Sequence, residues 1–471
     1  MPASNELRHN VLGTCGAFFF SIAIIAPAFT FTVGSTASIM YSGSVAPLTF
    51  LIAGLVSFSI VIPLSIYSRY IVNAGAYYKY VEASIDNRYV SKSMGLWFLL
   101  SNPGSIITGG SIIAWFTDGA LAELFNVTMP SYYFILISLI VPLLYLIISY
   151  GGIRSSARMA IAIGVIQLGV FTALAVAFMI KTSYNSLQYF DISASKNGLH
   201  GFFLAMVLGA FYSYGGYGSV VAFGEEIKSP RNTMKRAMIY SLGVMVFLET
   251  FYIYSLVAAA GPRINVLGSS IAPTLFLTKI YFGSYILTAI LFVSLLGVVF
   301  SYVLGGSSNT RYWYALARDG LLPTWVTRVH RRYGSPYVAV ALTFVISLVG
   351  LLSTEMVMIH YFGTSNGLFF SWAVWGTVGA FFSLSRSIII NTTLPIFIHK
   401  IKEKVRLLKH IAAPSVSTIV MLIAVVFSLI GLKSPMTVIY WIIGIFFLSA
   451  LAVIYLRGNN TKVDKLTDLI K

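Results

Sequence analysis

Two hydrophobic segments of the sequence are interrupted by residues that disturb helices. Residues 11–40 are interrupted by Ile24, Ile25, Ala26, Pro27 and Ala28, and residues 200–224 by Tyr212, Ser213, Tyr214, Gly215, Gly216, Tyr217 and Gly218. In a bilayer an unpaired backbone N–H or C=O costs several kcal/mol, so irregular backbone persists only where it is buried in protein or lines a cavity. We therefore interpret both interruptions, called the first break and the second break, as places where backbone groups bind a ligand.

The composition places these segments in a membrane. Hydrophobic residues make up 58% of the 471 residues, charged residues only 10%, and the mean hydropathy is +0.85. A soluble chain of this length could not bury so much apolar surface. The single cysteine, Cys15, excludes an internal disulfide, and the six histidines show no ligand spacing, so we predict no metal centre and no cofactor.

Hydropathy predicts an all-α integral membrane protein with about twelve transmembrane helices. Each expected span is long enough to cross the hydrocarbon layer. The first hydrophobic run is itself a span, so no cleavable signal is expected. The predicted spans are residues 11–40, 44–70, 93–121, 131–150, 156–181, 200–224, 237–261, 280–312, 337–353, 366–399, 413–432 and 435–456.

Each break opens a set of five spans. Paired broken helices at corresponding positions of two halves indicate the substrate site of a secondary transporter built on inverted repeats. We expect a first repeat at residues 11–181, a second at 200–399 and two further helices at 413–456, with terminal segments at 1–10 and 457–471. The discontinuous helices are then the first and the sixth.

The net charge of +17 follows the predicted topology. Of 31 Lys and Arg residues, all but five fall on one side of the spans; the five are Lys181, Lys196, Arg263, Lys279 and Lys433. The positive-inside rule then places both termini in the cytoplasm, and we expect a multi-pass protein of the cell membrane. The bilayer, not nucleic acid, is the partner of the basic residues.

Other functional classes lack their sequence signatures. No H-E-x-x-H motif or pair of intramembrane aspartates suggests an enzyme, and no G-x-x-x-x-G-K-[ST] loop suggests a primary pump. A channel is compatible with the hydropathy, but no filter repeat or charged ring is visible. We therefore expect a non-enzymatic secondary transporter.

Three loops resemble those of the amino acid–polyamine–organocation (APC) superfamily. Residues 224–237 read GEEIKSPRNTMKRA, residues 311–323 read RYWYALARDGLLP, and residues 73–80 read NAGAYYKY. All three fall in order on the predicted cytoplasmic side, and we interpret them as elements that help to close that side. The resemblance implies alternating access, with an amino acid as substrate.

In that family the ends of the broken helices receive the substrate. Half-helix N-termini and bare amides would bind the carboxylate, and unwound carbonyls the ammonium group. The resemblance assigns this role here to Ile24, Ile25, Ala26, Pro27, Ala28, Tyr212, Ser213, Tyr214, Gly215, Gly216 and Gly218. Alternatively, the two breaks are ordinary kinks of membrane helices and bind no substrate.

Two departures from the family bear on substrate and coupling. Many relatives carry a carboxylate at the second break, where this chain has Gly218, which favours a neutral substrate. Some proton-coupled relatives carry a lysine in the fifth span, where the nearest residue here is Gln167. Proton coupling is our first expectation, exchange of amino acids or polyamines the second, and sodium symport the third.

Few ionisable residues lie inside the predicted spans. Glu249 is either a proton carrier or a protonated structural residue. Ser294 and Ser301 either offer hydroxyls to a cation near the first break or only pack. For Arg386 we expect a side chain extending to the cytoplasmic interface, with an internal ion pair as the alternative.

Overall fold

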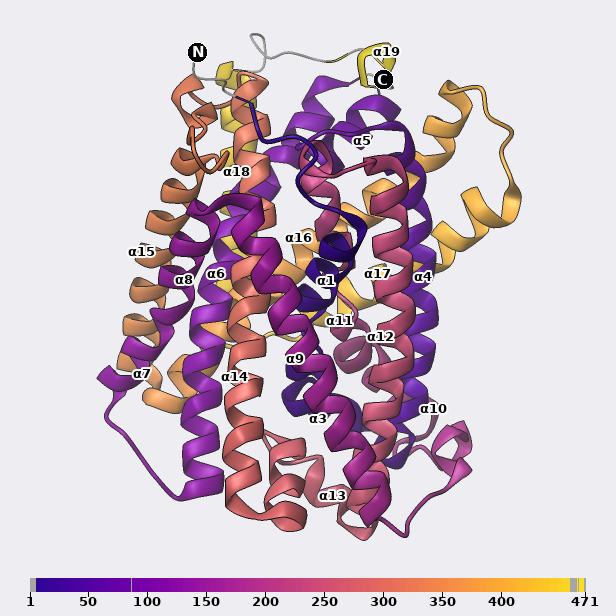
Figure 1. Ribbon diagram of the computed structural model, residues 1–471, viewed down its shortest axis with the longest axis vertical. Helices are drawn as coiled ribbons and strands as arrows, with labels where there is room; N and C mark the ends of the chain where they lie inside the picture. The colour runs from indigo at the N-terminus through magenta and orange to yellow at the C-terminus, as the bar shows by residue number, and fades with distance from the viewer. Residues whose placement is uncertain (1–5, 86, 458–463, 465, 470–471) are drawn as a thin grey trace.

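The protein is a bundle of long helices running between two opposite ends (Figure 1). The computed structural model describes residues 6–85, 87–457, 464 and 466–469, and in these ranges the only β-type pairing is an isolated bridge between Leu12 and Ile227. The helices α5 (Ala76–Ser84) and α19 (Leu466–Leu469) lie at one end, and α13 (Ile264–Leu267) lies at the other. We call these the α5 end and the α13 end. The predicted all-α membrane fold is confirmed.

The first half of the chain contains the first broken segment and four long helical segments. The broken segment consists of α1 (Thr14–Ile25), α2 (Pro27–Phe29), η1 (Thr30–Gly34) and α3 (Ser35–Ser42). It is followed by α4 (Ala46–Tyr70), by α6 (Arg88–Phe125), by one segment made of α7 (Ser131–Ser138) and α8 (Ile140–Tyr150), and by α9 (Gly152–Lys181).

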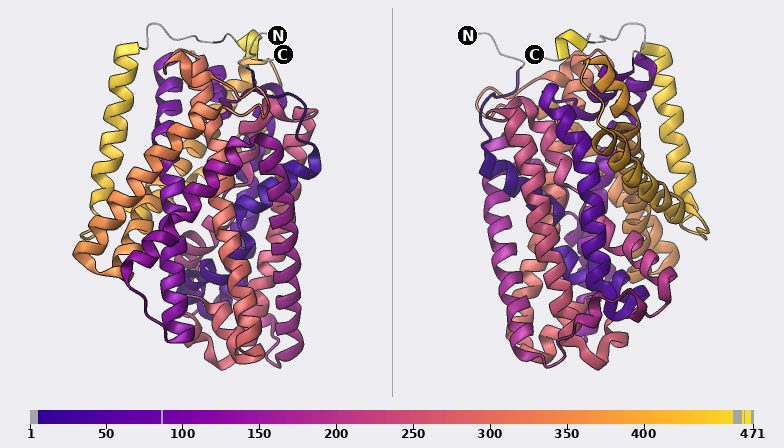
Figure 2. Two further views of the ribbon diagram at one scale, coloured as in Figure 1. Left: turned by 60° about the vertical axis from the view of Figure 1, so that its left-hand side comes forward. Right: turned by 90° about the vertical axis from the view of Figure 1, so that its right-hand side faces the viewer.

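The second half begins with the second broken segment. It consists of α10 (Gly198–Ala205), η5 (Met206–Ala210), α11 (Phe211–Ser213) and η6 (Tyr217–Glu226). Next come α12 (Pro230–Ala260), α14 (Pro273–Arg318), α15 (Tyr337–Phe362) and α16 (Thr364–Lys400). The last elements are η9 (Leu407–Ala412), α17 (Ala413–Leu429) and α18 (Val438–Arg457), and α18 runs along the outside of the bundle (Figure 2).

Ten helical segments of the described chain, not twelve, are long and apolar enough to cross a membrane. Two differences from the prediction account for this number. The first two expected spans form one continuous run, Thr14–Tyr70, and the expected sixth span is divided into short pieces by the second break. The division into two repeats stays a prediction, and its terminal segments, 1–10 and 457–471, lie partly outside the described residues.

Local sequence chemistry sets several helix boundaries. Pro230 is the first residue of α12, where the missing N–H of proline has no cost because that N–H has no partner inside the helix. The helix α14 ends at Arg318, and Gly320 follows with a φ of +89°, a conformation that glycine adopts without strain. Both boundaries therefore have a local cause in the residue type.

Candidate functional site

The first break interrupts a buried helix at Ala26. The helix α1 ends at Ile25, Ala26 takes left-handed backbone angles (φ 58°, ψ 65°), and α2 begins at Pro27. Because Pro27 has no N–H and its ring restricts the preceding residue, the helix cannot continue through this position. Ala26 and Ala28 are 3% and 0% exposed, so the irregular backbone lies inside the protein.

The second break is a turn that depends on glycine. The helix α11 ends at Ser213, Gly216 has a φ of +106°, and η6 begins at Tyr217. The first hydrogen bond of η6 runs from the Ser219 N–H to the Gly216 carbonyl at 3.0 Å. The N–H groups at the start of a helix precede its first internal bond and have no partner within it. The amides of Tyr217 and Gly218 occupy this position.

The structure brings the two breaks into direct contact. A Cβ placed on Gly216 would lie 2.6 Å from Ile24 Cγ2 and 3.0 Å from the Ile24 carbonyl carbon. The Ser21 hydroxyl also donates to the Tyr217 carbonyl at 3.3 Å. Segments separated by almost 200 residues therefore form one site, and only glycine at 216 permits this approach.

Gln167 reaches the first break from α9. Its Oε1 accepts a hydrogen bond from the Ala28 N–H at 3.1 Å, while its Nε2 is buried without a partner among the described residues. A Cβ on Gly297 of α14 would lie 2.5 Å from Ala28 Cβ and 3.0 Å from Gln167 Oε1, so glycine allows α14 to close over this contact. The Ala28 amide is thus bonded within the protein.

Ser294 and Ser301, the two candidate serines on α14, differ in their hydrogen-bond partners. The Ser301 hydroxyl donates to the Ile24 carbonyl at 3.4 Å, whereas Ser294 donates to the Ile290 carbonyl of its own helix at 2.7 Å. Only Ser301 therefore contacts the first break.

Glu249 lies on α12 and is 0% exposed. Neither carboxylate oxygen has a hydrogen-bond partner in the described chain, although the Thr30 hydroxyl lies within interaction range. Thr30 follows α2 directly, so Glu249 adjoins the first broken segment. An unpartnered carboxylate in this position needs a proton or a cation to offset the cost of burial.

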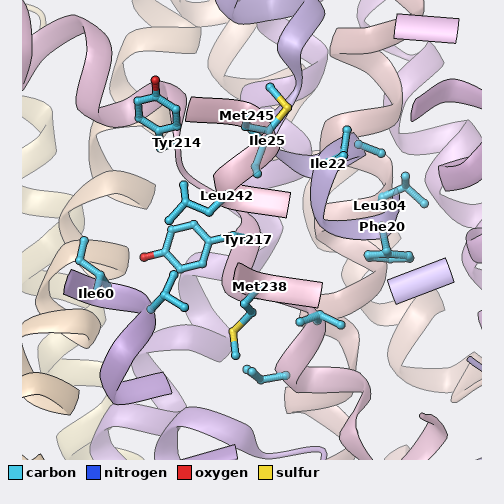
Figure 3. Close-up of a cluster of buried hydrophobic side chains, with 14 of the residues drawn as sticks. Phe20, Ile22, Ile25, Ile60, Tyr214, Tyr217, Met238, Leu242, Met245 and Leu304 are labelled. Carbon is cyan, nitrogen blue, oxygen red and sulfur yellow. The ribbon is translucent and has the colours of Figure 1, made fainter. Parts of the chain in front are cut away.

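The aromatic side chains of the second break differ in their freedom. Tyr214 is 1% exposed and its hydroxyl donates to the Phe50 carbonyl at 3.0 Å, so it forms a fixed wall. The Tyr212 hydroxyl is buried without a partner among the described residues. Figure 3 shows Leu242 between Tyr214 and Tyr217, with Ile25 and Met245 beside them, so the surroundings are largely apolar.

The motif residues of the loops meet at the α5 end. Arg311 of α14 binds Glu226 through Nε (2.9 Å) and NH2 (3.1 Å), and all of these atoms are buried. Arg318 binds Glu225, whose Oε1 also accepts the Ala74 N–H at 2.9 Å. These pairs join the second broken segment to α14 and to the loop before α5.

A second ionic cluster at the α5 end includes the C-terminal tail. Lys79 of α5 lies 3.0 Å from Glu82, 2.8 Å from Asp319 and 2.7 Å from Asp464. Lys92 contacts Asp319 and lies 2.8 Å from Glu82. Sequence motifs indicated the loops, but the pairing of these five residues comes from the structure alone.

The Arg386 side chain contacts aromatic rings, one of them on α5, and its extension to the cytoplasmic interface stays a prediction. Its guanidinium lies 3.9 Å from the ring centroid of Tyr77 and 4.8 Å from that of Phe98, and NH2 donates to Ser383 Oγ at 3.1 Å. No ion pair to a carboxylate is found for it among the described residues. Arg386 is thus half-buried in an aromatic setting, because the π faces of the rings attract a cation.

Sequence reasoning overlooked Glu355. The predicted ninth span ended at residue 353, but α15 continues to Phe362 and places Glu355 in its interior with 0% exposure. The apolar run Met356, Val357, Met358 and Ile359 was the signal that could have extended the span.

The fold and the paired breaks define a multi-pass helical membrane protein with a buried backbone site. The sequence matches the family model described as amino acid permease over residues 12–448, and the chain belongs to this family.

Three relatives illustrate the similarity. A Mycobacterium bovis protein named as an uncharacterized transporter is 26% identical over 392 residues, 77% of this chain and 78% of its own length. A Mycobacterium tuberculosis protein with the same kind of name is 28% identical over 196 residues, 40% of this chain and 42% of its own. The human large neutral amino acids transporter small subunit 2 is 27% identical over 202 residues, 41% of this chain and 36% of its own. This chain therefore spans less than half the length of the last two relatives.

Proposed function

We propose that the protein is a secondary active transporter that moves neutral amino acids across the cell membrane by alternating access. The observation that carries this proposal is the contact of the two helix breaks, in which Gly216 lies against the backbone of Ile24. The two buried breaks lie side by side, so amide N–H groups and carbonyl groups are close to each other. A zwitterion needs both, the N–H groups for its carboxylate and the carbonyls for its ammonium group.

In this proposal the breaks bind the two charged groups of the substrate. The amides of Tyr217 and Gly218, at the positive end of η6, receive the carboxylate. The carbonyl of Ile24, next to Ser301, receives the ammonium group. The Ala28 amide, bonded to Gln167, becomes available only if that bond opens.

A neutral side chain is favoured by the lack of acidic groups at the second break. Gly218 occupies the position where many relatives carry a carboxylate, so a cationic side chain would meet no counter-charge there. The apolar neighbours Leu242 and Met245 suit an uncharged side chain. The name of the human relative, which refers to large neutral amino acids, supports the same substrate class.

We propose proton coupling through Glu249, with exchange and sodium symport as alternatives. A carboxylate without partners beside Thr30 can bind a proton at the edge of the first broken segment. Sodium symport would instead use the Ile24 carbonyl and Ser301, because unwound carbonyls are the usual ligands for Na⁺ in broken transporter helices.

For the topology, we propose that the α5 end is cytoplasmic and that residues 11–181 and 200–399 are the two inverted repeats. The surplus of Lys and Arg in the loops of the α5 end supports this orientation. The ion pairs of Arg311 and Arg318 would then close the cytoplasmic side and must open before substrate can leave toward it.

The test is a thermal-shift screen of the purified protein against amino acids and polyamines, because a ligand that binds only the folded state raises its apparent stability. We expect large neutral amino acids to raise the melting temperature, and their esters, which lack the anionic group, to act weakly. Ala26→Leu should remove the shift by obstructing the first break. Equal effects of acid and ester would contradict carboxylate binding at the helix ends.

Uptake into vesicles separates the coupling modes. Proton coupling requires a pH gradient, sodium symport requires a sodium gradient, and obligate exchange occurs only in vesicles preloaded with substrate. If none of these conditions supports uptake of a ligand that binds, the transport proposal is wrong.

A further inference from the structure

Away from the two breaks, a proline interrupts the hydrogen bonding of a helix at the junction of α7 and α8, where Leu139 keeps helical backbone angles (φ −67°, ψ −17°). The helix α7 ends at Ser138 and α8 begins at Ile140. Pro142 has no N–H to donate to the carbonyl of Ser138 four residues earlier, so this carbonyl loses its helical partner. The junction of α7 and α8 therefore presents a carbonyl oxygen without its usual helical partner inside the membrane region.

The Ser138 carbonyl faces α6 at Gly110. A Cβ placed on Gly110 would lie 2.8 Å from this oxygen and 2.8 Å from Leu351 Cδ2. Leu351 stands one turn before Glu355 on α15, and Ser111 follows Gly110 on α6. Glycine at 110 thus lets α6, α7 and α15 converge on one point.

Oxygen atoms from four helices gather at this point. The Ser138 hydroxyl lies 2.8 Å from Glu355 Oε2, and the hydroxyls of Ser111 and Ser371 lie 2.8 Å from each other. Ser111 is also within interaction range of the Glu355 carboxylate. All four side chains are 0% exposed.

The hydrogen bonds available do not satisfy Glu355. Oε1 has no partner among the described residues. The Ser138 hydroxyl lies 2.8 Å from the Ile135 carbonyl as well as 2.8 Å from Oε2, and its single hydrogen can be donated to only one of them. A buried carboxylate with so few donors requires a proton or a cation to offset the cost of burial.

We propose that Glu355, Ser138, Ser111 and Ser371 form a binding site for a monovalent cation, Na⁺, distinct from the two breaks. The ligands are the Glu355 carboxylate, the freed Ser138 carbonyl and the neighbouring hydroxyls. Charge balance selects a monovalent ion, because one carboxylate and one Na⁺ are neutral together while a divalent ion would leave a buried net charge. Backbone carbonyls that lack a helical partner are recurring Na⁺ ligands in transporters.

A cation accounts for the site better than a proton does. A proton on Glu355 neutralises the carboxylate but adds only one donor, so at most one of the surrounding oxygens gains a partner. Na⁺ at the meeting point of these oxygens binds several of them at once. A bound ion would link α6, α7, α15 and α16 to one another. None of these four helices contains a residue of the two breaks.

The experiment measures the melting temperature of the purified full-length protein in NaCl against choline chloride at equal ionic strength, without substrate. We expect Na⁺ to stabilise the wild type in a saturable way and to have no such effect on Glu355→Gln, which keeps the size of the side chain but removes its charge. Ser111→Ala should raise the half-saturating Na⁺ concentration by about tenfold, the order expected when a partner of a metal site is lost.

Controls separate this site from the first break. Ser301→Ala and Glu249→Gln should keep the Na⁺ response, because neither residue lies at the α7 end. A direct count with ²²Na⁺ should give one fewer bound ion per chain in Glu355→Gln. If that variant does not fold, the Na⁺ response of the melting temperature is measured in Ser111→Ala and Ser371→Ala instead. No Na⁺ response in the wild type, or an unchanged response in the Glu355 or serine variants, overturns the proposal.

Discussion

The side chain of Gln167 and the backbone of Ala28 are joined across the bundle by a hydrogen bond of 3.1 Å. The bond links α9 to the first break and satisfies an amide that the break would otherwise leave without a partner. Gln167 thus acts as a neutral acceptor at the first break. Its buried Nε2 remains as a donor toward the same region.

Gln167→Ala should lower both stability and uptake. The substitution leaves the buried Ala28 N–H without an acceptor, which costs about 1–3 kcal/mol. Because Gln167 does not titrate, the shape of the pH profile of uptake should not change. Melting temperature and initial uptake rates test this, with the exposed Gln188→Ala as the matched control. A Gln167→Ala variant with wild-type melting and uptake would show that the bond is dispensable.

Gly216→Ala should abolish substrate binding while the protein still inserts in the membrane. The new Cβ would meet Ile24 at 2.6 Å, and the φ of +106° disfavours any side chain, at a cost of about 1–3 kcal/mol. Gly215→Ala should be milder, since its Cβ would contact only the Tyr212 carbonyl at 3.2 Å. Gly379→Ala, with nothing within 4 Å, is the control. Ligand-induced thermal shifts measure the effect, and wild-type affinity in Gly216→Ala would remove the second break from the site.

Glu249→Gln should flatten the pH dependence of uptake if Glu249 carries the coupled proton. The amide keeps the shape of the side chain but cannot exchange a proton. Uptake by reconstituted vesicles between pH 5 and 8 is the measurement. Glu123→Gln, at a carboxylate that accepts from the Ser270 hydroxyl at 2.6 Å, is the control for loss of an acidic group elsewhere. A full wild-type pH profile in Glu249→Gln would make Glu249 structural.

Asp464→Asn should release the C-terminal tail from α5. Partial burial opposes ionisation of this carboxyl group, but the hydrogen bond and charge of Lys79 outweigh burial and hold the pKa of Asp464 below its usual range. A lowered pKa stabilises docking at pH values above the unfolded pKa, and the contribution is lost as the pH falls through the folded pKa. Docking should therefore be constant from about pH 5 to 8 and weaken only in stronger acid.

Hydrogen exchange of the α19 amides measures this docking. Exchange should be faster in Asp464→Asn than in the wild type at neutral pH, while the exposed Asp468→Asn should behave as the wild type. Equal protection in Asp464→Asn and the wild type would show that the Lys79 contact does not hold the tail.

Local chemistry allowed the sequence to predict the class of fold and the two breaks. Pro27 lacks an N–H and Gly216 permits a positive φ, and both effects act within a few residues of the chain. The boundaries at Pro230 and Gly320 also have a local cause in the residue type. The long apolar runs likewise required a helical membrane protein, because hydrocarbon offers backbone groups no partner except the helix itself.

Contacts between distant residues required the tertiary structure. Gln167 and Ala28 are 139 residues apart, and Lys79 and Asp464 are 385 apart, so no local pattern predicts either pair. The extent of α15, which buries Glu355, and the aromatic neighbours of Arg386 also depend on how the helices pack. A sequence indicates which residues are costly to bury in a membrane, but only packing decides which partner compensates each of them.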